Sequence, residues 1–292
     1  FLVGDSGSSR WGIVWIMLPV LAASWALAEY FAGRRRLLLP SMTLVLAICG
    51  SAFAVCAALI APAFQDSSVG SFDEAAGAVS TAMYAGFLGS AAAALASHLR
   101  FNLPFALAPF ALSIAGLLYT AIAQAGQGDQ ILGGAATLAI GVATLIAAIW
   151  FDMKDPLRAS LSSDKAFWLH LAAAPQIIFG IRGLVLGSGF APAGAADASA
   201  MILVLAFFAI LSVALTRRAL IVSGLLTFAT AIIALLNSVS GGDTGQTLML
   251  SALLIGGSIV LLGGGWRTAR RALLRFMPAT GTISRIFPPE PA

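Results

Sequence analysis

The chain has 292 residues, of which 60% are hydrophobic and only 10% are charged, and its formal net charge is +4. An ordinary soluble domain carries about a quarter charged residues, so a single water-facing core cannot account for this composition. The sequence therefore excludes a soluble globular domain and predicts a protein whose main solvent is lipid.

Nine apolar stretches are long enough to cross a bilayer, which takes about 20 mainly apolar residues. In chain order they are 11–31, 38–64, 75–97, 103–123, 131–151, 166–186, 200–216, 219–239 and 247–266. A helix satisfies its own backbone amides in lipid, and no alternating pattern suggests a barrel. We therefore predict an all-α fold, a polytopic transmembrane bundle of about nine helices over residues 1–266.

The loop charges orient these spans. All but two of the 16 basic residues follow odd-numbered spans, whereas acidic residues such as Asp66, Asp129 and Asp243 follow even-numbered ones. By the positive-inside rule, the N-terminus lies outside and the C-terminus is cytoplasmic. The chain begins at Phe1 without a methionine, and we expect the native protein to start further upstream with one more helix.

Small residues at every fourth position predict which helices pack most closely, because lipid offers no hydrophobic drive for association. The third span carries Ala78, Ala82, Gly86, Ser90 and Ala94. The fifth carries Ala135, Ala139, Ala143 and Ala147, and the ninth carries Ala252, Gly256 and Gly264. We expect these three helices to be inner or interfacial; a dimerisation face is the alternative.

Ionisable and polar residues inside spans are the first candidates for function. Glu29 lies in the first span, and His170, Gln176 and Arg182 lie in the sixth. Glu29 and His170 share a depth near the cytoplasmic boundary, so they could pair and relay protons. The alternative is that Glu29 reaches toward Arg34–Arg36 while His170 bonds a neighbouring carbonyl.

Arg182 lies about 24 Å from the inner boundary, near the outer surface. A structural ion pair or snorkelling is favoured there over anion binding. His170, Gln176 and Arg182 point about 120° apart around an ideal helix, so they do not form one polar stripe. The connection from Asp152 to His170 is expected to be a solvated loop with local ion pairs.

The segment 267–292 is predicted to be a basic interfacial helix followed by an extended cytoplasmic tail. Arg267, Arg270, Arg271 and Arg275 would bind anionic lipids of the inner leaflet or dock a cytoplasmic partner. Nucleic-acid binding is not required to explain these charges.

Several catalytic patterns are missing from the sequence. It has no phosphate-binding glycine loop with its lysine, no HExxH, no Cys/His cluster and no Gly-x-Ser-x-Gly turn. We therefore expect no metal and no cofactor, and enzyme activity is disfavoured.

A family resemblance rests on the stretch DPLRASLSSDKAFWLHLAAAP, from Asp155 to Pro175. This stretch resembles a signature of the DUF2157-type families, which are polytopic inner-membrane proteins of bacteria without a known function. The resemblance implies a bacterial inner membrane and many helices. It implies no activity, cofactor or catalytic residue.

Two functions follow from these observations. The first is a structural or accessory subunit that packs against other membrane proteins, because ionisable groups are scarce inside the spans and the loops are short. The second is a small-solute transporter or permease, proton-linked through Glu29 and His170. A lipid-modifying enzyme ranks last because no nucleophile with its base is evident.

Overall fold

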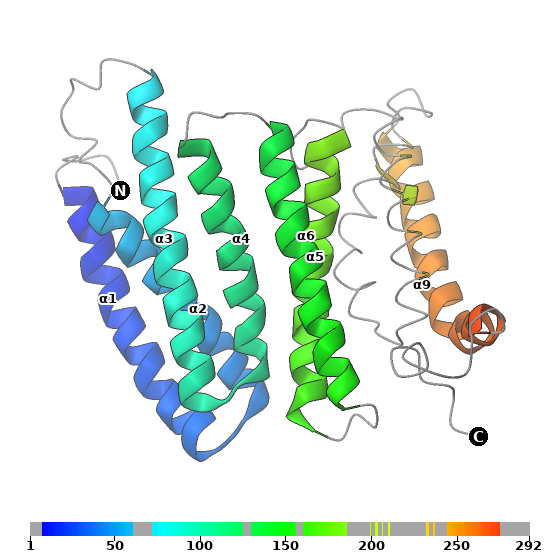
Figure 1. Ribbon diagram of the computed structural model, residues 1–292, viewed down its shortest axis with the longest axis horizontal. Coiled ribbons are helices and arrows are strands. Elements are labelled where there is room, and N and C mark those ends of the chain that lie inside the picture. The colour runs from blue at the N-terminus through cyan, green and yellow to red at the C-terminus, as the bar shows by residue number, and fades with distance from the viewer. Residues whose placement is uncertain are drawn as a thin grey trace. The chain divides into compact units, whose positions relative to one another are not determined.

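The computed structural model describes residues 8–60, 72–124, 130–155, 160–185 and 244–274, with isolated positions at 199, 202–203, 206, 210, 232–233 and 236 (Figure 1). Every regular element in this part of the chain is a helix, so the all-α prediction is confirmed there. The elements are α1 (Ser8–Ala28), the π-helix η1 (Glu29–Arg34), α2 (Leu38–Ile60), α3 (Phe72–Phe101), the 3₁₀ turn η2 (Pro104–Ala106), α4 (Leu107–Gln124), α5 (Gln130–Lys154), α6 (Leu161–Val185) and α9 (Thr244–Leu274).

Five helical stretches among the described residues are long and apolar enough to cross a membrane, as expected of a membrane protein. They are Trp11–Arg34, Leu38–Ile60, Val79–Phe101, Pro104–Ile122 and Leu132–Lys154. Helices α6 and α9 occupy the predicted sixth and ninth spans. The predicted seventh and eighth spans lie almost wholly outside the described residues.

The chain divides into two compact units, Phe1–Ala136 and Thr137–Ala292. In the first unit, α1 packs on α2, α2 on α3 and α3 on α4, so neighbours in sequence are neighbours in space (Figure 1). Short connections allow only antiparallel neighbours, which is the usual arrangement of consecutive membrane helices.

Three consecutive residues, 102–104, determine the turn between α3 and α4. Asn102 adopts a positive φ of 51°, a conformation that asparagine tolerates better than most residues, and its amide donates to the His98 carbonyl at 2.8 Å. Leu103 is extended, as a residue before proline must be, and Pro104 then opens η2. The chain therefore reverses within a few residues and starts α4.

Helix α3 is one of two inner helices of the first unit, since it packs on both α2 and α4, as its row of small residues predicts. A methyl group on Gly86 would lie 2.7 Å from the Phe53 ring of α2. Ser113 of α4 donates a hydrogen bond of 2.9 Å to the buried Ser90 hydroxyl. Ala94 is fully buried in the core cluster with Val45 of α2. The prediction for the third span is confirmed from Gly86 to Ala94.

In the second unit, α5 and α6 form a tight antiparallel pair at two glycines. A methyl group on Gly141 of α5 would lie 2.8 Å from the backbone nitrogen of Ile177. A methyl group on Gly180 of α6 would collide with the backbone of Leu138. The two backbones therefore approach too closely for any side chain at either position.

The predicted packing face of the fifth span was wrong. Ala139 and Ala143 are exposed, whereas Gly141, Thr144 and Ala148 are buried. Four alanines suggested one row, but glycine permits a closer approach than alanine, and this decided which face packs on α6.

The small-residue row of α9 also differs from expectation. Ala252, Gly256 and Gly264 are exposed, and the buried residues of this helix are Thr247 and Ser251. The helix continues without a break to Leu274, so the beginning of the predicted basic segment belongs to the same helix as the ninth span.

We expect the Gly180→Ala variant to lower the free energy of unfolding by about 1 to 3 kcal/mol, because the added methyl group overlaps the Leu138 backbone and forces α5 and α6 apart. Thermal unfolding of the purified protein in mild detergent measures this loss. The matched control is Gly256→Ala, where nothing lies within 4 Å of the new methyl group. Equal stability of the two variants would contradict the close approach.

Candidate functional site

Helix α6 is enclosed around most of its circumference. Ala172, Ala173 and Ala174 are consecutive and each is at most 2% exposed. Successive residues turn by 100° in an α-helix, so three of them cover about 200° of its surface. His170, Gln176 and Arg182 are therefore all buried, even though an ideal helix points them in different directions.

A histidine–aspartate pair lies inside this helix pair. The Nε2 atom of His170 is 2.8 Å from Oδ2 of Asp152 on α5. The His170 side chain is 0% exposed and that of Asp152 is 15% exposed. With an acceptor-only carboxylate beside it, Nε2 carries a proton and donates it. The predicted bond from His170 to a neighbouring carbonyl was wrong, since its partner is a carboxylate.

Asp152 is the functional residue that sequence reasoning missed. It was expected in a solvated loop, but α5 runs on to Lys154. Asp152 is eight residues after Thr144 and eleven after Gly141, and these spacings put all three near the same face of an α-helix. That periodicity was the signal that could have identified it.

The other nitrogen of His170 is also informative. Nδ1 is buried and has no hydrogen-bond partner. When Nε2 carries the proton, Nδ1 of a neutral imidazole is an acceptor. A buried acceptor without a donor costs free energy, so this atom can accept a hydrogen bond from a guest molecule.

A second polar contact lies deeper along the same helices. The Thr144 hydroxyl of α5 donates to the Ile140 carbonyl at 2.8 Å, and its oxygen lies 3.5 Å from Oε1 of Gln176 on α6. The Gln176 side chain is buried, and its Nε2 has no partner. Gln176 therefore presents an unsatisfied donor inside the α5–α6 pair.

Arg182 lies in the last turn of α6. It is 1% exposed, so snorkelling to the surface is excluded, whereas the alternative of a structural ion pair stays a prediction. His170, Gln176 and Arg182 are each six residues apart, about 9 Å along the axis. They form three separate layers and not one continuous hydrogen-bonded chain.

Glu29 has a different partner from either one expected. At the end of α1, its carboxylate accepts two hydrogen bonds from Arg100 of α3, at 2.8 and 3.1 Å. Arg34 also acts on this carboxylate through its charge, and the Glu29–His170 pair stays a prediction. The contact joins the ends of α1 and α3 and puts Arg34–Arg36 at the same end of the first unit as Arg100.

Basic and aromatic residues gather where α5 ends and α6 begins. The Lys154 ammonium lies 3.3 Å from the centre of the Trp150 ring, and Lys165 lies 5.9 Å from the Phe151 ring. Tryptophan and lysine together are typical of the membrane–water boundary. Asp152 therefore lies near the wet end of the helix pair, and His170 lies inside it.

No family model, curated protein or solved structure matches the chain. The resemblance to the DUF2157-type families therefore stays a prediction.

Within the described part of the chain, no three His, Cys, Asp or Glu side chains are grouped to hold a metal ion. Arg271 of α9 is exposed. Arg275 and the side chains of Arg267 and Arg270 lie outside the described residues, so the predicted lipid contact of the basic segment stays a prediction.

We expect Asp152→Ala to destabilise the protein by about 1 to 2 kcal/mol, because it leaves the buried Nε2 of His170 without an acceptor. Asp152→Asn should recover most of this loss, since its amide oxygen still accepts the bond. Unfolding in mild detergent compares the two variants. If Asn is as damaging as Ala, the hydrogen bond is not what stabilises this layer.

Exchanging the charges of Glu29 and Arg100 tests the contact between α1 and α3. Glu29→Arg alone should lower the thermal midpoint, because it places like charges together, and adding Arg100→Glu should restore it. The shift is small because both side chains are largely exposed. A double variant as unstable as the single variant would show that the pair does not form.

Proposed function

We propose that this chain is a proton-linked transporter or permease for a small solute, with Asp152 and His170 as its proton-carrying pair. The observation that carries the proposal is the fully buried His170, 2.8 Å from Asp152, with a free Nδ1 acceptor. Histidine titrates near physiological pH, and ionisable groups inside membrane helices commonly mark ion and proton pathways. Scarcity of buried ionisable groups had favoured an accessory role, and the enclosure of His170 and Arg182 reverses that preference.

The pair can carry a proton in three steps. Asp152, near the wet end of α5, exchanges protons with water. His170 takes up a proton at Nδ1 and becomes an imidazolium that the adjacent carboxylate stabilises. The Nε2 proton then passes to the Asp152 carboxylate, which releases it to water. The ring is left as the Nδ1–H tautomer, and a ring flip restores the starting state.

The deeper layers supply contacts for a solute. Gln176 offers an unsatisfied amide donor, and Arg182 offers a positive charge further along α6. Because the layers are about 9 Å apart, a polar solute or water is needed to bridge them. Proton uptake at His170 would then be coupled to the occupancy of the Gln176 layer.

We further propose about nine spans in a bacterial inner membrane, with the N-terminus outside and the C-terminus cytoplasmic. The Glu29–Arg100 contact supports this orientation because it groups the arginines that end α1 and α3 at one end of the first unit. The basic residues Lys154 and Lys165 likewise share one end of the α5–α6 pair.

Proton movement through purified protein tests the proposed pair. Reconstituted into liposomes that contain a pH-sensitive dye, the protein should acidify the interior under an imposed proton gradient. Asp152→Asn and His170→Gln should each lower the rate by about 100-fold, as expected when a proton-transferring group is lost. Both variants keep hydrogen-bonding side chains and should fold.

Glu29→Gln is the matched control, because Glu29 is bound to Arg100 and has no part in this pair. It should retain the wild-type rate. Wild-type flux in folded Asp152→Asn and His170→Gln would overturn the proposal, and loss of flux in Glu29→Gln alone would return the proton role to Glu29.

A second candidate is an accessory subunit that packs against other membrane proteins. Its support is the outward-facing small residues Ala252 and Gly256 of α9, since such residues allow close helix contact. Purification of the tagged protein from its own membranes, followed by mass spectrometry, tests this role. Stoichiometric partners that survive salt washes would favour it, whereas a monodisperse protein without partners would favour transport.

A further inference from the structure

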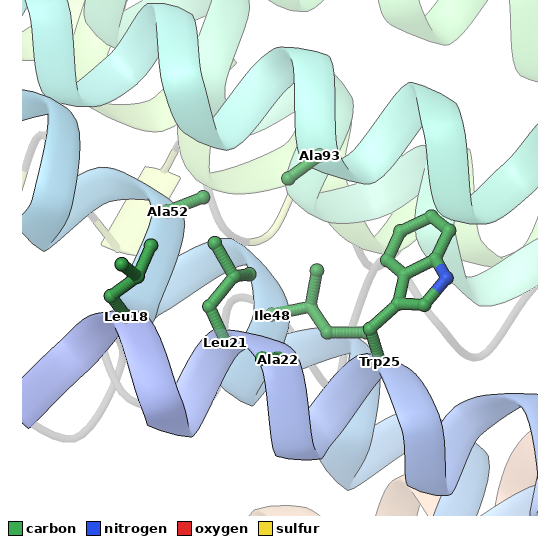
Figure 2. A pocket seen from close by; sticks show the side chains of 7 residues that line it. All are labelled: Leu18, Leu21, Ala22, Trp25, Ile48, Ala52 and Ala93. Carbon is green, nitrogen blue, oxygen red and sulfur yellow. The ribbon is translucent and has the colours of Figure 1, made fainter.

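An apolar groove lies between the first three helices of the first unit (Figure 2). Its volume is about 370 Å³, and it is open on one side. It is lined by Leu18, Leu21, Ala22 and Trp25 of α1, Ile48 and Ala52 of α2, and Ala93 of α3. Figure 2 shows Leu18 toward one end of this row and the Trp25 ring toward the other. No polar atom lines it, so its occupant is apolar.

The groove lies at depths that fall within one leaflet of a bilayer. Trp25 is four residues from Glu29, about 6 Å along the axis, and Leu18 is eleven residues from it, about 16 Å. Half of a hydrocarbon core is about 15 Å thick. If the charged Glu29–Arg100 contact lies at the membrane surface, the groove runs from just below the surface to about the midplane.

One end of the groove is strongly basic. Trp25 is close to the Glu29 carboxylate, and its ring makes a tilted contact with Phe101, the residue after Arg100, at 5.5 Å between ring centres. Beyond Glu29 come three consecutive exposed arginines, Arg34–Arg36. Together with Arg100, this end therefore holds four arginines against one glutamate. The resulting positive charge favours binding of an anionic group.

We propose that the groove binds one acyl chain of an anionic phospholipid whose headgroup phosphate contacts the arginines at its end. The apolar walls suit the chain, the depth suits one leaflet, and the charge suits the phosphate. A transmembrane helix of another protein fits less well, because it needs a contact along about 20 residues, whereas this groove extends over only two turns of α1. The inference concerns the first unit and goes beyond the transport role proposed for α5 and α6.

Fluorescence quenching by brominated lipids tests this site, because Trp25 lies in the groove. A variant that keeps Trp25 and replaces the other five tryptophans with phenylalanine is reconstituted with phospholipids brominated in mid-chain. Phosphatidylglycerol should quench Trp25 more strongly than phosphatidylcholine with identical chains. We expect a relative binding constant of about fivefold for each arginine that contacts the headgroup. Arg34→Ala with Arg36→Ala should reduce it toward 1, whereas Arg271→Ala should not.

Substitutions at two neighbouring alanines of α3 distinguish lipid binding in the groove from binding at the general lipid-facing surface. Ala93→Leu should fill the groove and remove the preference for the anionic lipid, whereas Ala92→Leu, on the exposed surface one residue earlier, should leave it unchanged. Equal quenching by both lipids, or a preference that survives Ala93→Leu, would overturn the proposal.

Native mass spectrometry of the unaltered chain provides a second measurement that needs no tryptophan replacements. With equal amounts of both lipids, the wild-type protein should retain one phosphatidylglycerol, and Ala93→Leu should lose it. Retention of phosphatidylcholine in equal measure, or binding of a second protein chain in place of lipid, would overturn the lipid site.

Discussion

The close approach of α5 and α6 at Gly141 and Gly180 is the contact on which the candidate site depends. Lipid tails are as apolar as leucine, so membrane helices gain little from hydrophobic burial and associate through close fit and polar contacts. At these two positions the helices come close enough to exclude any side chain. That approach brings Asp152 within 2.8 Å of His170 and Thr144 within reach of Gln176.

The same physics explains why the polar residues of α6 are enclosed. Charged or polar groups facing lipid have nothing to bond with, and each costs several kcal/mol. Helix α6 carries a histidine, a glutamine and an arginine on different faces, so it is stable in a bilayer only if protein surrounds it. The buried alanines beside these residues show the same enclosure. A helix held in this way can keep an unsatisfied Nδ1 or amide ready for a proton or solute, which an exposed helix cannot do.

The first unit uses its polar groups differently. Glu29 and Arg100 contact each other at the ends of their helices, where both remain largely exposed. The buried serine pair of α3 and α4 is neutral and satisfied. The apolar groove of the first unit has Trp25 at the end near the arginines, and we propose a lipid chain as its occupant. The proposed lipid site and the proposed proton pair can therefore be tested independently of each other.

The sequence by itself determined the helical character of the described residues, the positions of the first five spans and the inner place of α3, because hydrophobic length and small-residue spacing are local properties of the chain. It also singled out Glu29, His170, Gln176 and Arg182, since ionisable or amide groups stand out in an apolar background. Only the tertiary structure decided their partners. Asp152 faces His170 because α5 continues past the expected end of its span, and Glu29 meets Arg100 because α1 and α3 end together. The packing face of α5 was decided by two glycines whose backbones touch the opposite helix, and a pattern of alanines cannot reveal that. Partners and close approaches join residues far apart in sequence, so no local periodicity encodes them.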